Sequence, residues 1–201
     1  MMHIFFRIST VLLILSLLTA CQPNTNAVEE KEELSEDEKI YFPQGSEIIF
    51  ETQKTLGSNL MSAMKKGGVQ YALSFCNLNA FAIKDSLSKI YNVDIRRKSK
   101  KYRNPADKPN EIEAQVINDY EKAALEGKSP SFVIKSIDDN HIGFYAPILL
   151  GDFCLKCHGT VGKELLDTDY ADIKKLYPED LAIGYKSGDL RGIWSLTFEQ
   201  N

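Results

Sequence analysis

The alternation of apolar and polar positions predicts two helices before the first strand. Apolar residues fall near helical spacing from Ser46, which can cap a helix, up to Gly67-Gly68, which breaks it. A second helix is expected from about Val69 to Ser88. Its apolar face is formed by Ala72, Phe75, Cys76, Asn79, Ala80, Ile83 and Leu87, mostly three or four residues apart. This face is expected to point toward the core.

Downstream of residue 92 the pattern changes to short alternating runs typical of strands, with two helices between them. One helix is expected from Pro109 to about Glu126, and a shorter one over residues 165–176. Strands are expected over residues 93–97, 131–138, 142–150 and 193–198, with the middle two forming a hairpin around Asp139-Asn140. Long helices followed by mostly local antiparallel strands predict an α+β fold.

The start of the chain has the pattern of an export signal. A short polar start is followed by the apolar run Val11–Leu18 and then by Leu18-Thr19-Ala20-Cys21. The last four residues resemble the lipobox of bacterial lipoproteins, which implies cleavage after residue 20 and lipid on the thiol of Cys21. A plain signal peptide with an incidental cysteine, or an uncleaved anchor, are the alternatives. We therefore expect residues 1–20 to be a lipoprotein signal peptide and the mature protein to be exported and anchored to a bacterial membrane.

Charge is unevenly distributed over the 201 residues, which carry 24 basic and 28 acidic side chains. Residues 29–39 hold seven acids and two lysines, whereas the chain from Ile40 onward has 21 charges of each sign. The near-neutral remainder has no basic stripe of the kind that binds nucleic acid. The acidic run indicates a solvated, extended tether. We expect a lipidated tether over residues 21–44 and one folded domain over residues 45–201.

The segment with the most specific chemistry is Phe153–Gly159, which contains Cys154, Cys157 and His158 in the C-x-x-C-H pattern of covalent haem c attachment. Two thiols three positions apart lie on one face of a helical turn, where each can add to a haem vinyl group. The imidazole that follows can bind the iron as an axial ligand. The alternative is a structural zinc site of three cysteines and one histidine, with Cys76 as the fourth ligand.

The ligand opposite His158 is left open by the residues alone. Cys76, His141, Met61, Met64, a lysine amine or water could occupy that position, although His141 sits beside the predicted turn and is expected to be exposed. Six cations fall between Arg96 and Arg103. They form either a solvated loop or, in part, a contact with the haem propionates, since arginine makes planar two-pronged bonds to carboxylates.

Several short motifs together resemble a family of exported haem c domains catalogued mainly as a domain of unknown function. They are Ala72-Leu73-Ser74-Phe75-Cys76, Arg97 with Ser99, Arg103-Asn104-Pro105, Cys154-Leu155-Lys156-Cys157-His158, Tyr177-Pro178-Glu179-Asp180, Gly184-Tyr185-Lys186-Ser187-Gly188-Asp189 and Arg191-Gly192. The resemblance spans roughly Gly45 to Phe198. It implies a PAS-like fold with one haem c, His158 as the proximal ligand and Cys76 as the distal ligand. The chain departs from the family in lacking the proline often found shortly after that cysteine.

These features predict a membrane-anchored haem c protein that transfers electrons or senses redox state or a small ligand. A thiolate ligand stabilises ferric iron and lowers the reduction potential. Arg97 and Arg103 are the expected propionate partners, and an unknown redox or signalling protein is the expected partner. No transmitter domain follows Phe198, so sensing would pass to a separate protein. Enzymatic activity is not expected, with a peroxidase-type haem enzyme and the zinc module as alternatives.

Overall fold

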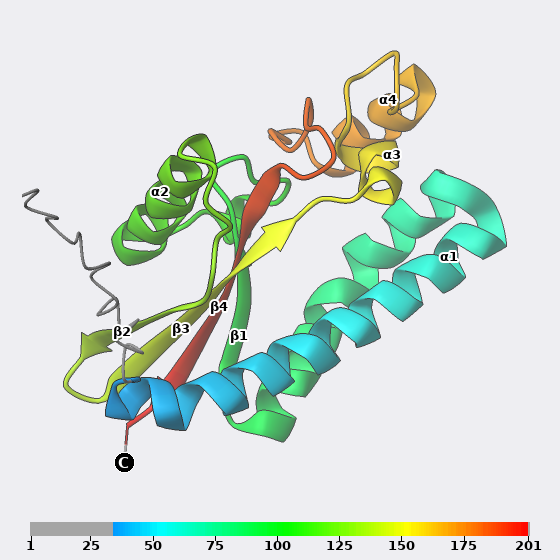
Figure 1. Ribbon diagram of the computed structural model, residues 1–201. Coiled ribbons are helices and arrows are strands. Elements are labelled where there is room, and N and C mark those ends of the chain that lie inside the picture. Colours follow the sequence, from blue (N-terminus) through cyan, green and yellow to red (C-terminus); the bar gives the residue numbers. More distant parts are fainter. Residues whose placement is uncertain (1–33, 201) are drawn as a thin grey trace, which may run out of the picture. The chain divides into compact units, whose positions relative to one another are not determined.

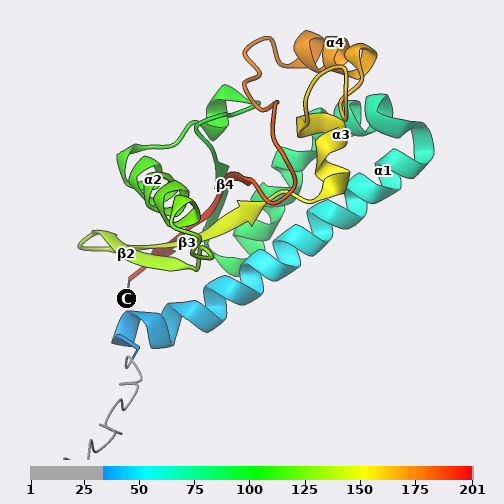
Figure 2. The same ribbon diagram turned by 45° about the horizontal axis from the view of Figure 1, so that its top comes forward.

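The computed structural model describes residues 34–200, apart from the side chains of residues 76–81. Within this range a four-stranded antiparallel sheet in the order β1-β4-β3-β2 is covered by α1 on one face and by α2 on the other (Figure 1). Two short helices, α3 (Leu155–His158) and α4 (Asp167–Leu176), lie beyond one end of the sheet beside the bend of α1 (Figure 2). The α+β prediction is confirmed.

Helix α1 (Glu36–Tyr91) consists of two helical segments joined at Gly67 and Gly68, whose dihedral angles are not helical. The predicted break is therefore confirmed, because Gly68 has a φ of 66°, a conformation that glycine adopts without strain. The predicted cap at Ser46 lies eleven residues too far along the chain. Ser35 caps the helix, and its side chain and that of Glu38 form a capping box.

The folded unit also begins earlier in the chain, because it includes the first turns of α1. The compact unit begins at Leu34 rather than at residue 45. The ring of Tyr41 lies 5.1 Å from that of Phe198, and Phe42 lies 4.2 Å from Phe132. The last part of the expected tether is thus the first part of α1, because the capping box and these aromatic contacts outweigh its charge.

The strands occur close to where the alternation predicts them. They are β1 (Asp94–Lys98), β2 (Val133–Asp138), β3 (His141–Leu149) and β4 (Leu190–Glu199). β2 and β3 form the predicted hairpin, and the C-terminal strand β4 pairs between β1 and β3. β1 and β3 therefore run in the same direction, and β3 leads straight into the C-x-x-C-H segment.

The sheet has an apolar core on each face. Toward α1 the buried side chains include Ile95, Phe144, Trp194 and Leu196, and Ile48 of the helix packs among them. Toward α2 (Glu111–Leu125) the core is formed by Val116, Ile117, Tyr120, Tyr145 and Ile193. The two cores fix both helices on the sheet and so fix the position of the bend of α1 beside α3.

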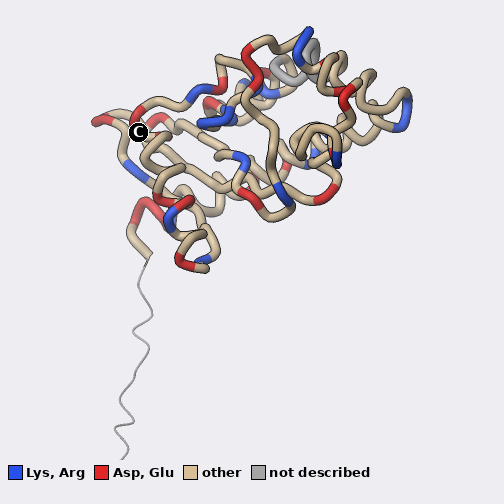
Figure 3. Tube along the Cα trace, turned by 90° about the horizontal axis from the view of Figure 1, so that it is seen from above, with Lys and Arg blue, Asp and Glu red and all other residues tan. Residues whose placement is uncertain are grey.

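Charges of both signs are interspersed over the described part of the chain (Figure 3). Arg96 is paired with Asp85 and Asp94, and Lys100 with Glu121. Among residues 34–200 no helix is both long and apolar enough to cross a lipid bilayer.

Candidate functional site

The two cysteines and the histidine of the C-x-x-C-H motif lie on a short helical stretch at the end of β3. A 3-10 helix, η2 (Asp152–Cys154), continues into α3, so the motif is helical from its first cysteine to its histidine. Both Cys154 and Cys157 are half-buried, and neither forms a disulfide within the described residues. The two cysteines are three residues apart on this helical stretch, the spacing that thioether attachment to one porphyrin requires. A Cβ atom at Gly159 would lie 2.6 Å from the carbonyl oxygen of Leu155, so only glycine fits there.

The imidazole of His158 is oriented by a backbone carbonyl. Its Nδ1 lies 2.7 Å from the oxygen of Ala182. A carbonyl only accepts, so Nδ1 carries the proton and donates, and Nε2 of the neutral ring keeps its lone pair. Desolvation by burial, and then the charges of Arg103 and Arg191, hold the pKa of His158 well below its usual value. The ring is therefore neutral and held in one orientation, and the lone pair on Nε2 is of the kind that binds a metal.

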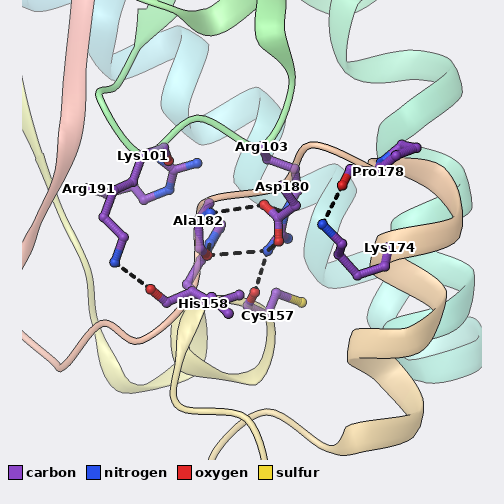
Figure 4. A network of polar contacts seen from close by, with 10 residues as sticks. Lys101, Arg103, Cys157, His158, Lys174, Pro178, Asp180, Ala182 and Arg191 are labelled. Atoms are coloured by element: carbon purple, nitrogen blue, oxygen red, sulfur yellow. Dashed lines mark hydrogen bonds and ion pairs between the residues drawn. The ribbon is translucent and has the colours of Figure 1, made fainter.

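Arg103 joins three segments behind this histidine (Figure 4). Its Nε donates to Asp180 at 3.0 Å, and its Nη2 donates to the carbonyl of Cys157 at 2.6 Å and, at 3.4 Å, to that of Ala182. Asp180 in turn accepts from the backbone N–H of Ala182 at 3.0 Å. The Arg103–Asp180 pair thus fixes the carbonyl that orients His158. The propionate role expected for Arg103 stays a prediction, although two of its donor nitrogens have protein partners.

Arg97 lies on the sheet face that α1 covers, next to Trp194. The two residues are directly opposite in the pairing of β1 with β4, and the guanidinium carbon lies 6.0 Å from the centre of the indole ring. Arg97 Nε and Trp194 Nε1 are both buried, and neither has a hydrogen-bond partner among the described residues. Arg97 therefore has a donor available for an anion, as the propionate prediction requires, but no contact here tests that prediction.

Lys84 is a residue that the sequence reasoning missed. Its side chain, from α1, is 1% exposed and lies 4.0 Å from Asp107. Burial, followed by repulsion from Arg97, lowers the pKa of Lys84 to about 8. The predicted apolar face of this helix included Ile83 and Leu87 but not Lys84. The one sequence signal for its burial is that Lys84 lies four residues after Ala80, on the predicted apolar face of the helix.

Asp180, Ala182 and Trp194 were also missed as parts of the site. In the sequence, Asp180 is one residue of a family motif, and Trp194 is one residue of a predicted strand. Their roles depend on partners 77 and 97 residues away in the sequence, namely Arg103 and Arg97. Local patterns contain no signal for such pairs.

Two predicted site residues lie outside the described part of the structure. Cys21 is one, and the side chain of Cys76 is the other. The backbone of residue 76 belongs to the second segment of α1. One turn earlier, Leu73 packs with Leu165 and Ile173, which follow the C-x-x-C-H motif in the chain. This segment of α1 is therefore a neighbour of the structure that follows His158.

His141 is remote from this site. It begins β3, whereas the motif follows the end of β3, and eight residue steps of a strand span about 26 Å. Its Nδ1 lies 2.7 Å from a carboxylate oxygen of Asp138. The part of the chain that the structure describes contains no group of three histidine, cysteine or acidic side chains placed to hold a metal.

Comparisons with known proteins identify a family and a similar fold. A protein-family model described as "Tll0287-like: Tll0287" matches residues 24–198. A comparison with curated proteins found no relative. Among solved structures, the chain is similar to one described as the crystal structure of the cyanobacterial heme-protein Tll0287, with a TM-score of 0.56 and 20% identity. That match covers 79% of this chain and 97% of the other, and at this identity it shows a shared fold.

Proposed function

The chain belongs to the Tll0287-like family, and from this membership and the site geometry we propose that it is a haem-binding protein. The group is haem c, attached through Cys154 and Cys157, with His158 as an axial ligand. The observation that carries the proposal is the bond from His158 Nδ1 to Ala182, because it leaves Nε2 of a neutral ring for the iron. The solved structure with a similar fold is described as a heme-protein, which supports the same assignment.

The residues around the motif fit such a group. The two thiols are half-buried on one helical stretch, and the buried donors on Arg97 and Trp194 suit the carboxylates of a porphyrin. Bound there, haem would supply one-electron chemistry at its iron. The chain's own residues hold the group covalently, orient the axial imidazole and surround it with positive charge. The position of the second α1 segment supports Cys76 as the second axial ligand.

The antiparallel sheet with long N-terminal helices supports a PAS-like domain. We further propose that lipid on Cys21 anchors the exported protein to a bacterial membrane, and that the His/Cys-ligated haem transfers electrons or senses redox state or a small ligand there. An unidentified protein would be its redox or signalling partner. No enzymatic reaction is proposed.

The test is to produce the full chain in a bacterium that matures cytochromes c and to measure its mass and absorption spectra. We expect the mass of one covalently bound haem and, in the ferric and ferrous forms, spectra of six-coordinate iron. A Cys76→Ser variant should keep the haem but change the ferric spectrum. A colourless protein with no added mass overturns the haem proposal and favours zinc, which metal analysis would detect. An unchanged spectrum for Cys76→Ser rejects that ligand alone, and ready binding of cyanide to the wild type favours a haem enzyme.

A further inference from the structure

Three donor-bearing side chains, hereafter the donor cluster, lie between α1 and the sheet: Lys84, Arg97 and Trp194. Arg97 lies 6.0 Å from the centre of the Trp194 ring, and its charge acts on the buried Lys84. Arg97 and Trp194 face each other across β1 and β4. Ala146 of β3 continues the same row of the sheet, three residues before the strand ends and the chain enters the C-x-x-C-H segment. The cluster is therefore at the end of the sheet from which the haem motif extends.

Two donors of this cluster have no acceptor in the described part of the protein. Arg97 Nε and Trp194 Nε1 are both donors, both are shielded from solvent, and the described residues offer neither of them an acceptor. Trp194 is only 4% exposed. Buried donors in native proteins are almost always paired, so two adjacent exceptions call for a ligand that accepts.

Positive charge also gathers at the cluster. Lys84 and Arg97 are neighbouring cations, and Lys84 lies 4.0 Å from the partly exposed Asp107. Arg191 adds a further cation whose pKa is lowered by burial and by nearby arginines. Because Arg97 is charged and its buried Nε has no acceptor among the described residues, the site suits an anion rather than a neutral ligand.

We propose that Lys84, Arg97 and Trp194 bind one propionate carboxylate of the haem. This inference depends on the proposed haem function. A carboxylate has two oxygens with enough lone pairs to accept from Arg97 Nε, Trp194 Nε1 and the ammonium group of Lys84 together. The position of the cluster at the motif end of the sheet favours the haem's own carboxylate over a free anion. Lys84 and Trp194 are thereby assigned to the site in addition to Arg97.

The experiment uses the haem-loaded full chain and resonance Raman spectroscopy, in which the propionate bending band responds to hydrogen bonding of the carboxylate. Trp194→Phe removes one donor and keeps an aromatic ring, and Lys84→Met removes the ammonium group with little change in side-chain length. Each variant should shift the band relative to the wild type. Arg96→Gln is the matched control, because Arg96 neighbours Arg97 but is paired with Asp85 and Asp94. Its band should be that of the wild type.

The possible outcomes separate the two proposals. If the variants contain covalent haem and the band is unchanged in both, the propionate site is rejected while the haem function stands. If the wild type itself carries no haem, the proposed function fails. A free anion is the remaining occupant. In that case added acetate or phosphate would raise the melting temperature of the wild type but not of Lys84→Met, and the Raman band would not move, which rejects the propionate assignment.

Discussion

At the scale of single residues, the site depends on what orients one imidazole. His158 donates to the carbonyl of Ala182, and the backbone around that carbonyl is fixed by Asp180 and Arg103. Asp180 is fully buried and Arg103 is 13% exposed as side chains. Breaking one half of such a pair leaves an uncompensated charge inside the protein. The ion pair therefore both stabilises the loop and positions the imidazole of His158.

Arg103→Met should lower the free energy of unfolding by about 3–5 kcal/mol, because it leaves Asp180 buried without its partner. Urea unfolding followed by circular dichroism measures the change. The matched control is Arg96→Gln, whose pair with Asp85 is exposed on both sides and should contribute at most about 1 kcal/mol. Equal losses in the two variants would contradict the role assigned to the buried pair.

Two buried tyrosines make the protein sensitive to alkali. Burial, and then the charge of Glu113, raises the pKa of Tyr145 to about 12, and burial raises that of Tyr120 as well. The unfolded chain loses these protons near pH 10, whereas the folded chain keeps them. The stabilisation is complete below about pH 10 and is lost as the pH rises toward the folded pKa, at about 1.4 kcal/mol per pH unit for each tyrosine.

Tyr145→Phe should therefore flatten the fall of the unfolding free energy above about pH 10, since phenylalanine has no proton to lose. Urea titrations at a series of pH values up to about 12 give the slope for each protein. A variant with the wild-type slope would show that Tyr145 does not contribute to alkaline unfolding.

At the scale of elements, the contact of α1 with the sheet depends on a glycine. A Cβ atom at Gly45 would lie 2.7 Å from the ring of Phe144, so the helix backbone lies directly on the aromatic side chain. By contrast, a Cβ atom at Gly57, three turns further along the same helix, would meet nothing within 4 Å. The two glycines have the same chemistry in the unfolded chain but opposite environments in the fold.

Gly45→Ala should destabilise the protein by about 1–3 kcal/mol, because the added methyl group forces α1 away from the sheet. Gly57→Ala should stabilise it by about 0.5–1 kcal/mol through the higher helix propensity of alanine. Thermal unfolding of both variants tests the pair. Similar effects of the same sign would argue against close packing of α1 at Gly45.

At the scale of the whole molecule, the described unit contains two kinds of core. The clusters around Leu196 and around Tyr120 join the sheet to α1 and α2 and contain no residue of the C-x-x-C-H motif. Another cluster joins Leu150, Leu155, Ala182 and Tyr185, with Cys154 packed against it. The core of the sheet therefore does not include the motif, whereas the segment around α3 packs on a small core next to the C-x-x-C-H motif.

A chain with Cys154→Ser and Cys157→Ser should carry no covalent haem and should lose stability unevenly. Amide hydrogen exchange is expected to stay slow in β1, β3 and β4, because their core contains none of the altered residues. Exchange should become faster in α3 and in residues 180–185. Uniformly faster exchange over the whole sheet would show that the haem segment is part of one cooperative core.

The features that the sequence by itself determined are those set by nearby residues. The spacing of Cys154, Cys157 and His158, the break at Gly67-Gly68, the β2–β3 hairpin and the α+β class all follow from local geometry. The capping box at Ser35 and Glu38 is equally local, and its S-x-x-E spacing marks the true start of α1 within the acidic run.

Only the tertiary structure decided which distant side chains meet at the site. The pairing of Arg103 with Asp180, the position of Trp194 opposite Arg97 and the burial of Lys84 each join segments far apart in the chain. Strand register and helix packing set these contacts, and neither leaves a pattern in the neighbouring residues. For that reason the C-x-x-C-H motif could be recognised in the sequence, while the side chains that orient its histidine and surround it with charge could not.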